Sequence, residues 1–183
     1  GIDNDSSIHT SFTMRNMPYI SIDAKSKPGC VNVGIDEKKM AEKLMDVLLD
    51  NGHTRIMFCS LKPIFHDVSE YNMSITNQER RKGIEQSILK HNLTLSVMEN
   101  YSYVEIETSF EDSYKKAKEI LQSPDRPSAI YCMGDIQAFG FYKSAAELGI
   151  NIPEDLSVVT FDNLKLTHIL YPEITAIHQP GYE

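Results

Sequence analysis

Polar side chains directly follow the short apolar runs of this sequence, and these residues are the best placed to do chemistry. Asp23 follows YISI, Asp135 follows AIYCMG, and Asp162 follows VVTF. Ser60 follows RIMFC, and Gln179 follows ITAIH. Carboxylates accept hydrogen bonds, while hydroxyls and amides both donate and accept them. Brought together, these groups would suit a polar ligand.

The elements that must position these residues can be inferred from the spacing of apolar side chains. Apolar positions recur at helical spacing between Asp36 and Gly52, and the stretch from Thr76 to Glu79 has the pattern of a helix-capping box. The sequence predicts helices over about 36–52, 76–92, 109–122 and 134–148, and strands over about 55–60, 93–98, 128–133, 156–161 and 174–179.

Alternation of helices with short apolar strands indicates an α/β fold in which helices cover both faces of a parallel sheet. Ligands of such sheets bind beyond the carboxyl ends of the strands, where the polar residues named above would gather. Two of these residues also have a purely structural interpretation. Asp135 is a good N-cap for the helix it opens, and Asp162 with Asn163 suits a turn.

Composition limits the possible classes of function. The 183 residues are 41% hydrophobic and 24% charged, which is typical of a globular protein, and the formal net charge is −8. This negative charge argues against direct binding of this chain to DNA phosphates or to an anionic membrane. No apolar run approaches the length of a membrane span, and the first residues show no secretory signal. Three cysteines, Cys30, Cys59 and Cys132, have no CxxC spacing and are expected to be buried thiols in a reducing compartment.

Enzyme signatures are missing from the sequence. It contains no GxSxG, GxxxxGK[ST] or HExxH pattern, and no GxGxxG follows a strand. The six histidines have no metal-ligand spacing, so we expect neither a metal nor a cofactor. A glycosidase-like pair of carboxylates at the strand ends remains an open alternative.

Four stretches resemble successive motifs of the lactose-repressor/galactose-repressor (LacI/GalR) family of transcription regulators. They are GHTRIMF, RRKGIEQSI, RPSAIYCMGDIQAFGFYKSAAELGINIPEDLSVVTFDN and LYPEITAIHQP. The resemblance runs from about Met17 to Gln179 and concerns the effector-binding core.

This resemblance implies a three-layer α/β/α fold like that of type I periplasmic binding proteins, with two similar subdomains joined by three crossovers. Residues 1–34 would end the N-terminal subdomain, 35–176 would form the C-terminal subdomain, and 177–183 would form the return crossover. The family's helix-turn-helix and the first elements of the N-terminal subdomain have no counterpart here. The chain would therefore be an excerpt that does not bind operator DNA by itself.

The resemblance also assigns roles to particular residues. Asp162 would accept hydrogen bonds from the hydroxyls of an effector, and Arg80 would donate to the effector. Asp23 and Gln179 would line the cleft near the crossovers, and Asp135 matches an acid of the family. Gly134 departs from the pattern, since the family usually has Asn, Ser or Thr there. Without the resemblance, Arg80 could equally pair with Glu79 or with a carboxylate across the sheet.

Two hypotheses of function follow from the resemblance. The first is the effector domain of a transcriptional repressor, in which a sugar or sugar phosphate changes DNA affinity through a helix-turn-helix outside this chain. Such a regulator is expected to be a cytoplasmic homodimer without membrane contact. The second is a periplasmic-type sugar-binding protein of an uptake system. The fold alone does not distinguish the two hypotheses.

Overall fold

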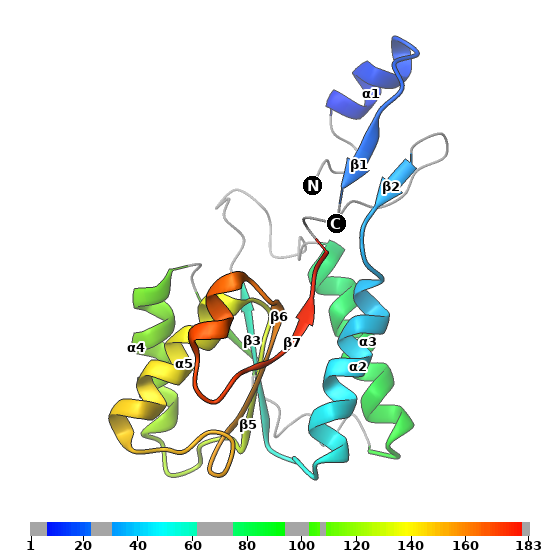
Figure 1. The fold of residues 1–183 in the computed structure, drawn as a ribbon. Coiled ribbons are helices and arrows are strands. Elements are labelled where there is room, and N and C mark those ends of the chain that lie inside the picture. The colour runs from blue at the N-terminus through cyan, green and yellow to red at the C-terminus, as the bar shows by residue number, and fades with distance from the viewer. Residues whose placement is uncertain (1–6, 23–30, 62–74, 94–102, 107–108, 181–183) are drawn as a thin grey trace.

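The computed structural model describes residues 7–22, 31–61, 75–93, 103–106 and 109–180 (Figure 1). In chain order, its elements are α1 (Ser7–Met14), β1 (Ile20–Ile22), β2 (Val31–Val33), α2 (Glu37–Asp50), β3 (Ile56–Leu61), α3 (Ile75–Lys90), β4 (Tyr103–Ile106), α4 (Phe110–Leu121), β5 (Ala129–Cys132), α5 (Asp135–Leu148), β6 (Ser157–Asp162), the 3₁₀ helix η2 (Lys165–Ile169) and β7 (Thr175–His178).

The larger part of the molecule is a three-layer α/β/α unit. Its five-stranded sheet has the order β4-β3-β5-β6-β7, and every neighbouring pair is parallel. Helices α2 and α3 cover one face of the sheet, and α4 and α5 cover the other (Figure 1). The α/β fold class expected from the sequence is confirmed.

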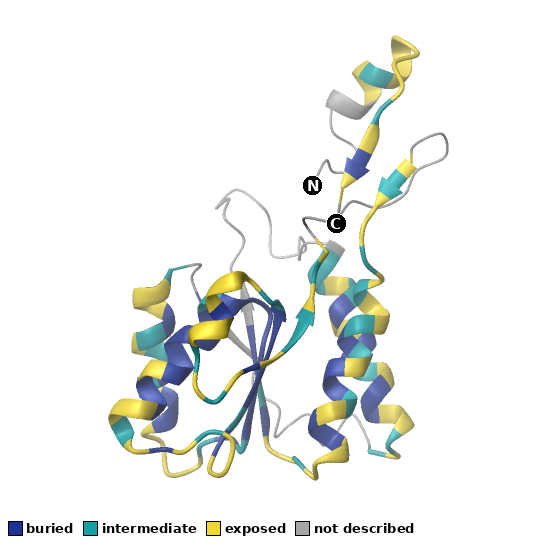
Figure 2. Ribbon diagram, viewed as in Figure 1, coloured by how far each residue is buried: buried dark blue, intermediate teal, exposed yellow. Residues whose placement is uncertain are grey.

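The sheet separates two apolar cores, because side chains of successive strand residues point to opposite faces. Tyr131 belongs to the core beneath α2 and α3, whereas its neighbours Ile130 and Cys132 belong to the core beneath α4 and α5. All four residues of β5 are buried, as expected for a central parallel strand, and the sheet is the most deeply buried layer in Figure 2.

Two glycines allow the helices of each layer to approach closely. A Cβ on Gly83 of α3 would lie 2.1 Å from the Lys38 carbonyl oxygen of α2. A Cβ on Gly140 of α5 would lie 2.6 Å from the Ser113 carbonyl carbon of α4. Both distances are shorter than a side-chain carbon tolerates, so each helix pair is packed around a glycine.

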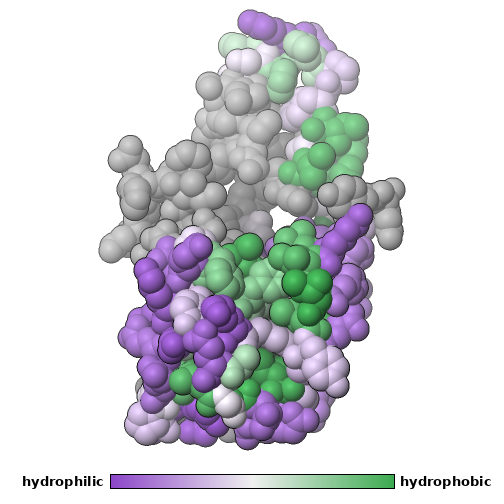
Figure 3. All heavy atoms as spheres, turned by 60° about the vertical axis from the view of Figure 1, so that its left-hand side comes forward, coloured by the Kyte–Doolittle hydropathy of each residue, from purple (hydrophilic) through white to green (hydrophobic). Residues whose placement is uncertain are grey.

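A second, two-stranded sheet is formed by β1 and β2, which pair in parallel and extend away from the larger unit (Figure 1). The apolar side chains of Ile20, Ile22, Val31 and Val33 are exposed on it. Figure 3 shows apolar residues at the surface of both parts of the molecule, between hydrophilic ones.

Several local expectations were wrong, for identifiable reasons. Helix α3 already begins at Ile75, so Thr76 lies inside the helix and is not its N-cap. Strand β4, over Tyr103–Ile106, was missed because its YVEI sequence has no clear boundary signal. The strand expected over 93–98 lies almost entirely outside the described residues. The 3₁₀ helix η2 had no apolar period that would predict it.

Candidate functional site

Asp162 ends β6 in a backbone conformation that is rare for residues with side chains. Its φ is 88°, and that of Asn163 is 52°. Such conformations cost energy and concentrate at functional sites and tight turns. The Gln179 Nε2 atom donates to Asp162 Oδ1 at 2.7 Å, and the Gln179 backbone N–H donates to the Asp162 carbonyl at 3.3 Å. The ends of β6 and β7 are therefore joined at the carboxyl edge of the sheet.

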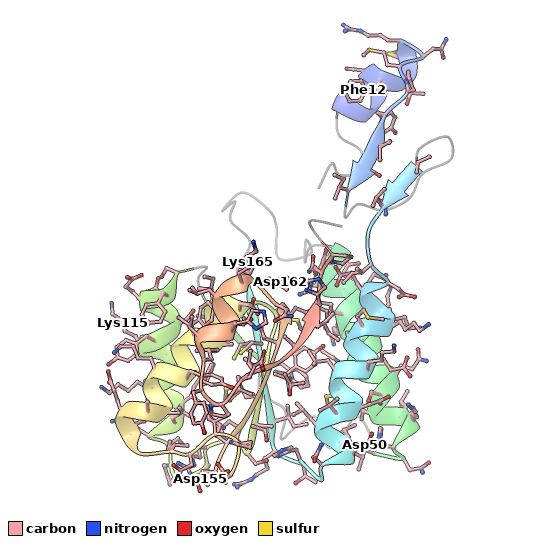
Figure 4. All side chains as sticks on the ribbon, in the orientation of Figure 1. Phe12, Asp50, Lys115, Asp155, Asp162 and Lys165 are labelled. Atoms are coloured by element: carbon pink, nitrogen blue, oxygen red, sulfur yellow. The ribbon has the colours of Figure 1, made fainter. Side chains whose placement is uncertain are left out.

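The location of Asp162 is visible in Figure 4, where it lies near Lys165 and at the opposite end of the unit from Asp50 and Asp155. This is the edge at which parallel α/β sheets bind ligands. The turn interpretation also holds in part, because Asn163 Oδ1 accepts a hydrogen bond from Thr167 Oγ1 at 2.9 Å and so anchors η2.

Asp135 is buried and holds the turn after β6. Its Oδ2 accepts from the Leu164 backbone N–H at 2.7 Å, and its Oδ1 accepts from Thr160 Oγ1 at 3.1 Å. Burial raises the pKa of Asp135, and the hydrogen bonds from Leu164 and Thr160 oppose that rise. The N-cap interpretation was wrong, because Gly134 is the N-cap of α5 and Asp135 is its first helical residue. Through these two hydrogen bonds, Asp135 stabilises the turn next to the candidate site.

Arg80 is only 4% exposed and is held from three directions. Its Nε donates to Glu37 Oε2 at 2.7 Å, and its Nη1 donates to the Met133 carbonyl at 2.6 Å. Its guanidinium carbon lies 3.8 Å from the centroid of the Phe161 ring. The sequence had left open that Arg80 pairs with Glu79 or with a carboxylate across the sheet. The structure shows Glu37 as its partner, whereas Glu79 pairs with Lys82. Since Met133 directly follows β5 and Phe161 is the next-to-last residue of β6, Arg80 binds α3 to the same edge of the sheet.

Arg80, Asp135, Asp162 and Gln179 thus occupy one edge, and Asp23 lies outside the described residues. Ser60 lies within β3 rather than after it. A surface hollow of about 820 Å³ lies elsewhere, between the end of α5 and the segment before β7, and none of the predicted site residues lines it. The hollow therefore does not bear on the predicted site.

Two residues at this edge were not anticipated as parts of a site. Glu37 reads from the sequence as an ordinary first-turn acid, yet it holds Arg80. Gln137 is a fully buried amide in α5 whose two polar atoms have no hydrogen-bond partner among the described residues. The available signal for Gln137 was a polar residue inside the apolar stretch of DIQAFG.

Tyr101, Tyr103 and Phe110 cluster in the sequence around a strand end and could either stack on a sugar ring or pack in the core. No described contact brings them to this edge. Phe110 stacks on Tyr114 of its own helix at 6.4 Å between ring centroids. Tyr101 and the side chain of Tyr103 lie outside the described part of the structure. Packing, the simpler interpretation, is what the structure shows for Phe110.

Other classes of site find no support in the described part of the chain. Within it, no group of three or more potential metal-binding side chains comes together. No helix there is long and apolar enough to cross a membrane. Cys59 and Cys132 are buried and free, as expected, and Cys30 lies outside the described ranges.

Comparison with known proteins agrees with this architecture. Residues 45–182 match the family model described as "Periplasmic binding protein-like domain". The structure resembles that of a LacI family transcriptional regulator from Enterococcus faecium with bound ribose, with a TM-score of 0.78 and 23% identity over 98% of this chain and 61% of that one. It also resembles the transcription regulator CcpA of Lactococcus lactis, with a TM-score of 0.73 and 21% identity over 98% and 62%.

The similar curated proteins are transcription regulators. The transcriptional repressor PurR of Vibrio vulnificus is 35% identical over 135 residues, which are 73% of this chain and 36% of PurR. The repressor CytR of Escherichia coli K12 is 31% identical over 152 residues, which are 82% of this chain and 41% of CytR. The chain thus spans less than half the length of these relatives.

The fold, the strand-end site and the match over residues 45–182 define a periplasmic binding protein-like domain. The similarity to PurR and CytR indicates the family as well as the fold class, because both proteins are helix-turn-helix repressors. The chain belongs to the LacI/GalR family and corresponds to its effector-binding region.

Proposed function

We propose that this chain is the effector-binding region of a DNA-binding transcriptional repressor that responds to a sugar or sugar phosphate. The observation that carries the proposal is the junction of Asp162 and Gln179 beside Arg80, at the carboxyl edge of a parallel sheet. Similar regulators of known structure contain bound ribose or phosphate, which supports a ligand of this class.

The roles within the site follow from chemistry. Asp162 accepts hydrogen bonds from ligand hydroxyls, and Gln179 orients its carboxylate. Arg80, held in place by Glu37, brings a planar set of N–H donors to this edge. Because its Nε and Nη1 atoms already have partners, only its remaining N–H groups are available to a ligand. We also propose that Asp23 lines the cleft near the crossovers, and Asp135 holds the turn.

The proposed organisation assigns residues 1–34 to the end of the N-terminal subdomain, 35–176 to the C-terminal subdomain and 177–183 to the return crossover. The separate β1–β2 sheet supports the first of these boundaries. The full-length protein binds operator DNA through a helix-turn-helix outside this chain, acts in the cytoplasm and catalyses no reaction.

The full-length protein is proposed to be a homodimer, because operators with paired half-sites require a two-fold axis. The η2 face, defined here as Leu164, Leu166, Ile169 and Tyr171, provides exposed apolar side chains for such a contact, and Tyr171 is 97% exposed. These four residues lie within eight consecutive positions of the sequence.

The proposal is tested with the full-length protein and a panel of pentoses, hexoses and their phosphates. Isothermal titration calorimetry should identify at least one that binds with micromolar to millimolar affinity. The same compound should change the affinity of the protein for its own promoter DNA, measured by fluorescence anisotropy. A compound that binds without changing DNA affinity would contradict the regulatory role.

A further inference from the structure

Gln137 of α5 has an amide that no described residue satisfies. The side chain is 0% exposed, and neither Nε2 nor Oε1 has a hydrogen-bond partner among the described residues. A buried amide without hydrogen-bond partners destabilises the folded protein. An apolar residue of the same size would avoid this cost, so a partner from outside the chain is the simplest reason to have Gln here.

The unpartnered amide lies beside Gly134, on the side where any other residue would carry its Cβ atom. A Cβ built on Gly134 would lie 3.5 Å from Asp162 Oδ2 and 3.7 Å from Gln137 Oε1. No other atom of the described residues comes within 4 Å of that point, the chain neighbours of Gly134 apart. We call this space the Gly134 niche. It lies between the principal acid of the proposed site and the unsatisfied amide.

We propose that Gln137 is a specificity-determining residue and that the Gly134 niche holds one hydroxyl group of the effector. This inference rests on the proposed function and specifies the chemistry of its ligand. A hydroxyl that packs over the bare Cα of Gly134 lies farther out than this Cβ point, and rotation of the buried Gln137 side chain brings the amide within hydrogen-bond reach of it. Gln137 thereby supplies the polar contact that Gly134 lacks.

The two oxygens that border the niche determine which chemical group fits it. An ionised carboxylate only accepts hydrogen bonds, so Asp162 requires a donor. The Gln137 amide can donate through Nε2, and a hydroxyl that donates its one hydrogen to Asp162 can at the same time accept from that Nε2. A phosphate or carboxylate in the niche would face the charge of Asp162. The niche therefore selects the uncharged polyol part of a ligand, and any phosphate would bind elsewhere.

The test compares Gln137→Met with wild type in the full-length protein. The probes are ribose, a panel of other monosaccharides and their phosphates, and singly deoxygenated analogues of each binder. Gln137→Met should bind the sugar about three- to tenfold more weakly in calorimetry, the usual effect of one hydrogen bond. For the analogue that lacks the niche hydroxyl, the variant and wild type should bind equally. Gln122→Met, on exposed α4 surface, is the matched control and should leave every affinity unchanged.

Thermal unfolding without sugar separates this role from a structural one. If Gln137 lacks a partner in the free protein, Gln137→Met should keep or raise the Tm, because methionine removes an unsatisfied amide. Gly134→Ala gives a second test. Its methyl meets neighbours at ordinary contact distances and its backbone is extended, so the fold should persist while the niche is filled. Sugar affinity should fall in this variant as well.

Each outcome decides between the possibilities. If a sugar binds wild type and both variants equally, the inference is wrong while the proposed function stands. If Gln137→Met lowers the Tm and leaves affinity unchanged, the amide has a structural partner such as ordered water, and the inference is again overturned. If no sugar or sugar phosphate binds wild type, the proposed function fails and the inference fails with it.

Discussion

Asp162 combines an uncommon backbone conformation with the carboxylate that the proposed ligand needs. Its φ of 88° disfavours alanine, whereas asparagine tolerates positive φ and can still accept from Gln179. We therefore expect Asp162→Asn to fold like wild type and to bind effector about 1.5–3 kcal/mol more weakly, because the charged acceptor is lost. Asp162→Ala should lose as much binding and about 1 kcal/mol of stability in addition.

Urea denaturation and calorimetry on the two variants measure these terms separately. If the Asp162→Asn protein binds the effector as tightly as wild type, Asp162 does not contact the effector. A collapse of stability in both variants would show that the carboxylate serves only the turn.

Arg80 and Glu37 form a nearly buried ion pair that holds α3 and α2 to the strand ends. A lysine at position 80 cannot reproduce the planar fork that reaches both Glu37 and the Met133 carbonyl. Arg80→Lys should lower the free energy of unfolding by about 1–3 kcal/mol. It should also weaken effector binding.

A double-mutant cycle with Glu37→Gln gives the coupling between the two side chains. Residues in direct contact typically show coupling of about 0.5–3 kcal/mol. Strictly additive effects in urea denaturation would mean that the observed ion pair contributes nothing to stability.

At the scale of elements, the glycines decide how closely the helix pairs pack. Gly83→Ala would force apart α2 and α3, and Gly140→Ala would force apart α4 and α5, because each new Cβ meets backbone atoms. Each variant should lose about 1–3 kcal/mol of stability or more, as expected for overpacking. Gly134→Ala is the matched control, with only ordinary contacts. Unchanged Tm values for the first two variants would contradict the close helix approach.

His53 connects the segment after α2 to the starts of two strands. Its Nδ1 lies 3.0 Å from Ser128 Oγ and its Nε2 lies 2.9 Å from Ser157 Oγ. Burial lowers the pKa of His53 below 6.5, so the unfolded chain binds this proton more readily than the folded one. The contribution of His53 to stability is complete above pH 6.5 and is lost as the pH falls toward the folded-state pKa.

His91 provides a control of opposite sign. Its hydrogen bond to Asp50 raises its pKa, so its contribution is complete below pH 6.5 and is lost as the pH rises through the folded-state pKa. Urea denaturation between pH 5 and 8 should show less acid destabilisation in His53→Asn than in wild type, and more in His91→Asn. Identical pH profiles for all three proteins would refute both assignments.

The sequence predicted the elements whose signals are local. Apolar period located α2, α4 and α5, and the structure adds Asp36 and Ser109 as the N-caps of the first two. The parallel sheet followed from alternation, and Asp162 and Gln179 were placed at one edge because parallel strands share their carboxyl edge. Glu37 beside Arg80, and Gln137 beside Gly134, could not be predicted, because both contacts depend on how separate elements pack in three dimensions.

At the scale of the whole molecule, the proposed dimer depends on the exposed η2 face. Charged residues in an apolar interface leave buried charges without partners, which costs several kcal/mol. Leu166→Asp with Ile169→Asp should therefore convert the full-length protein from dimer to monomer at micromolar concentration. Light scattering after size exclusion measures this change. Val47→Asp, at an exposed apolar site on α2, is the control and should remain dimeric.

The pairing of Asp162 with Gln179 has a mechanical consequence. Gln179 directly follows β7, where the chain leaves the five-stranded sheet (Figure 1). One carboxylate thus serves as a latch on the departing chain. A ligand that competes for Asp162 Oδ1 must either break the hydrogen bond from Gln179 Nε2 or bind in a way that leaves this bond intact. If the proposed effector binds there, it acts directly on the segment that leaves the five-stranded sheet after β7, without any relay through the core.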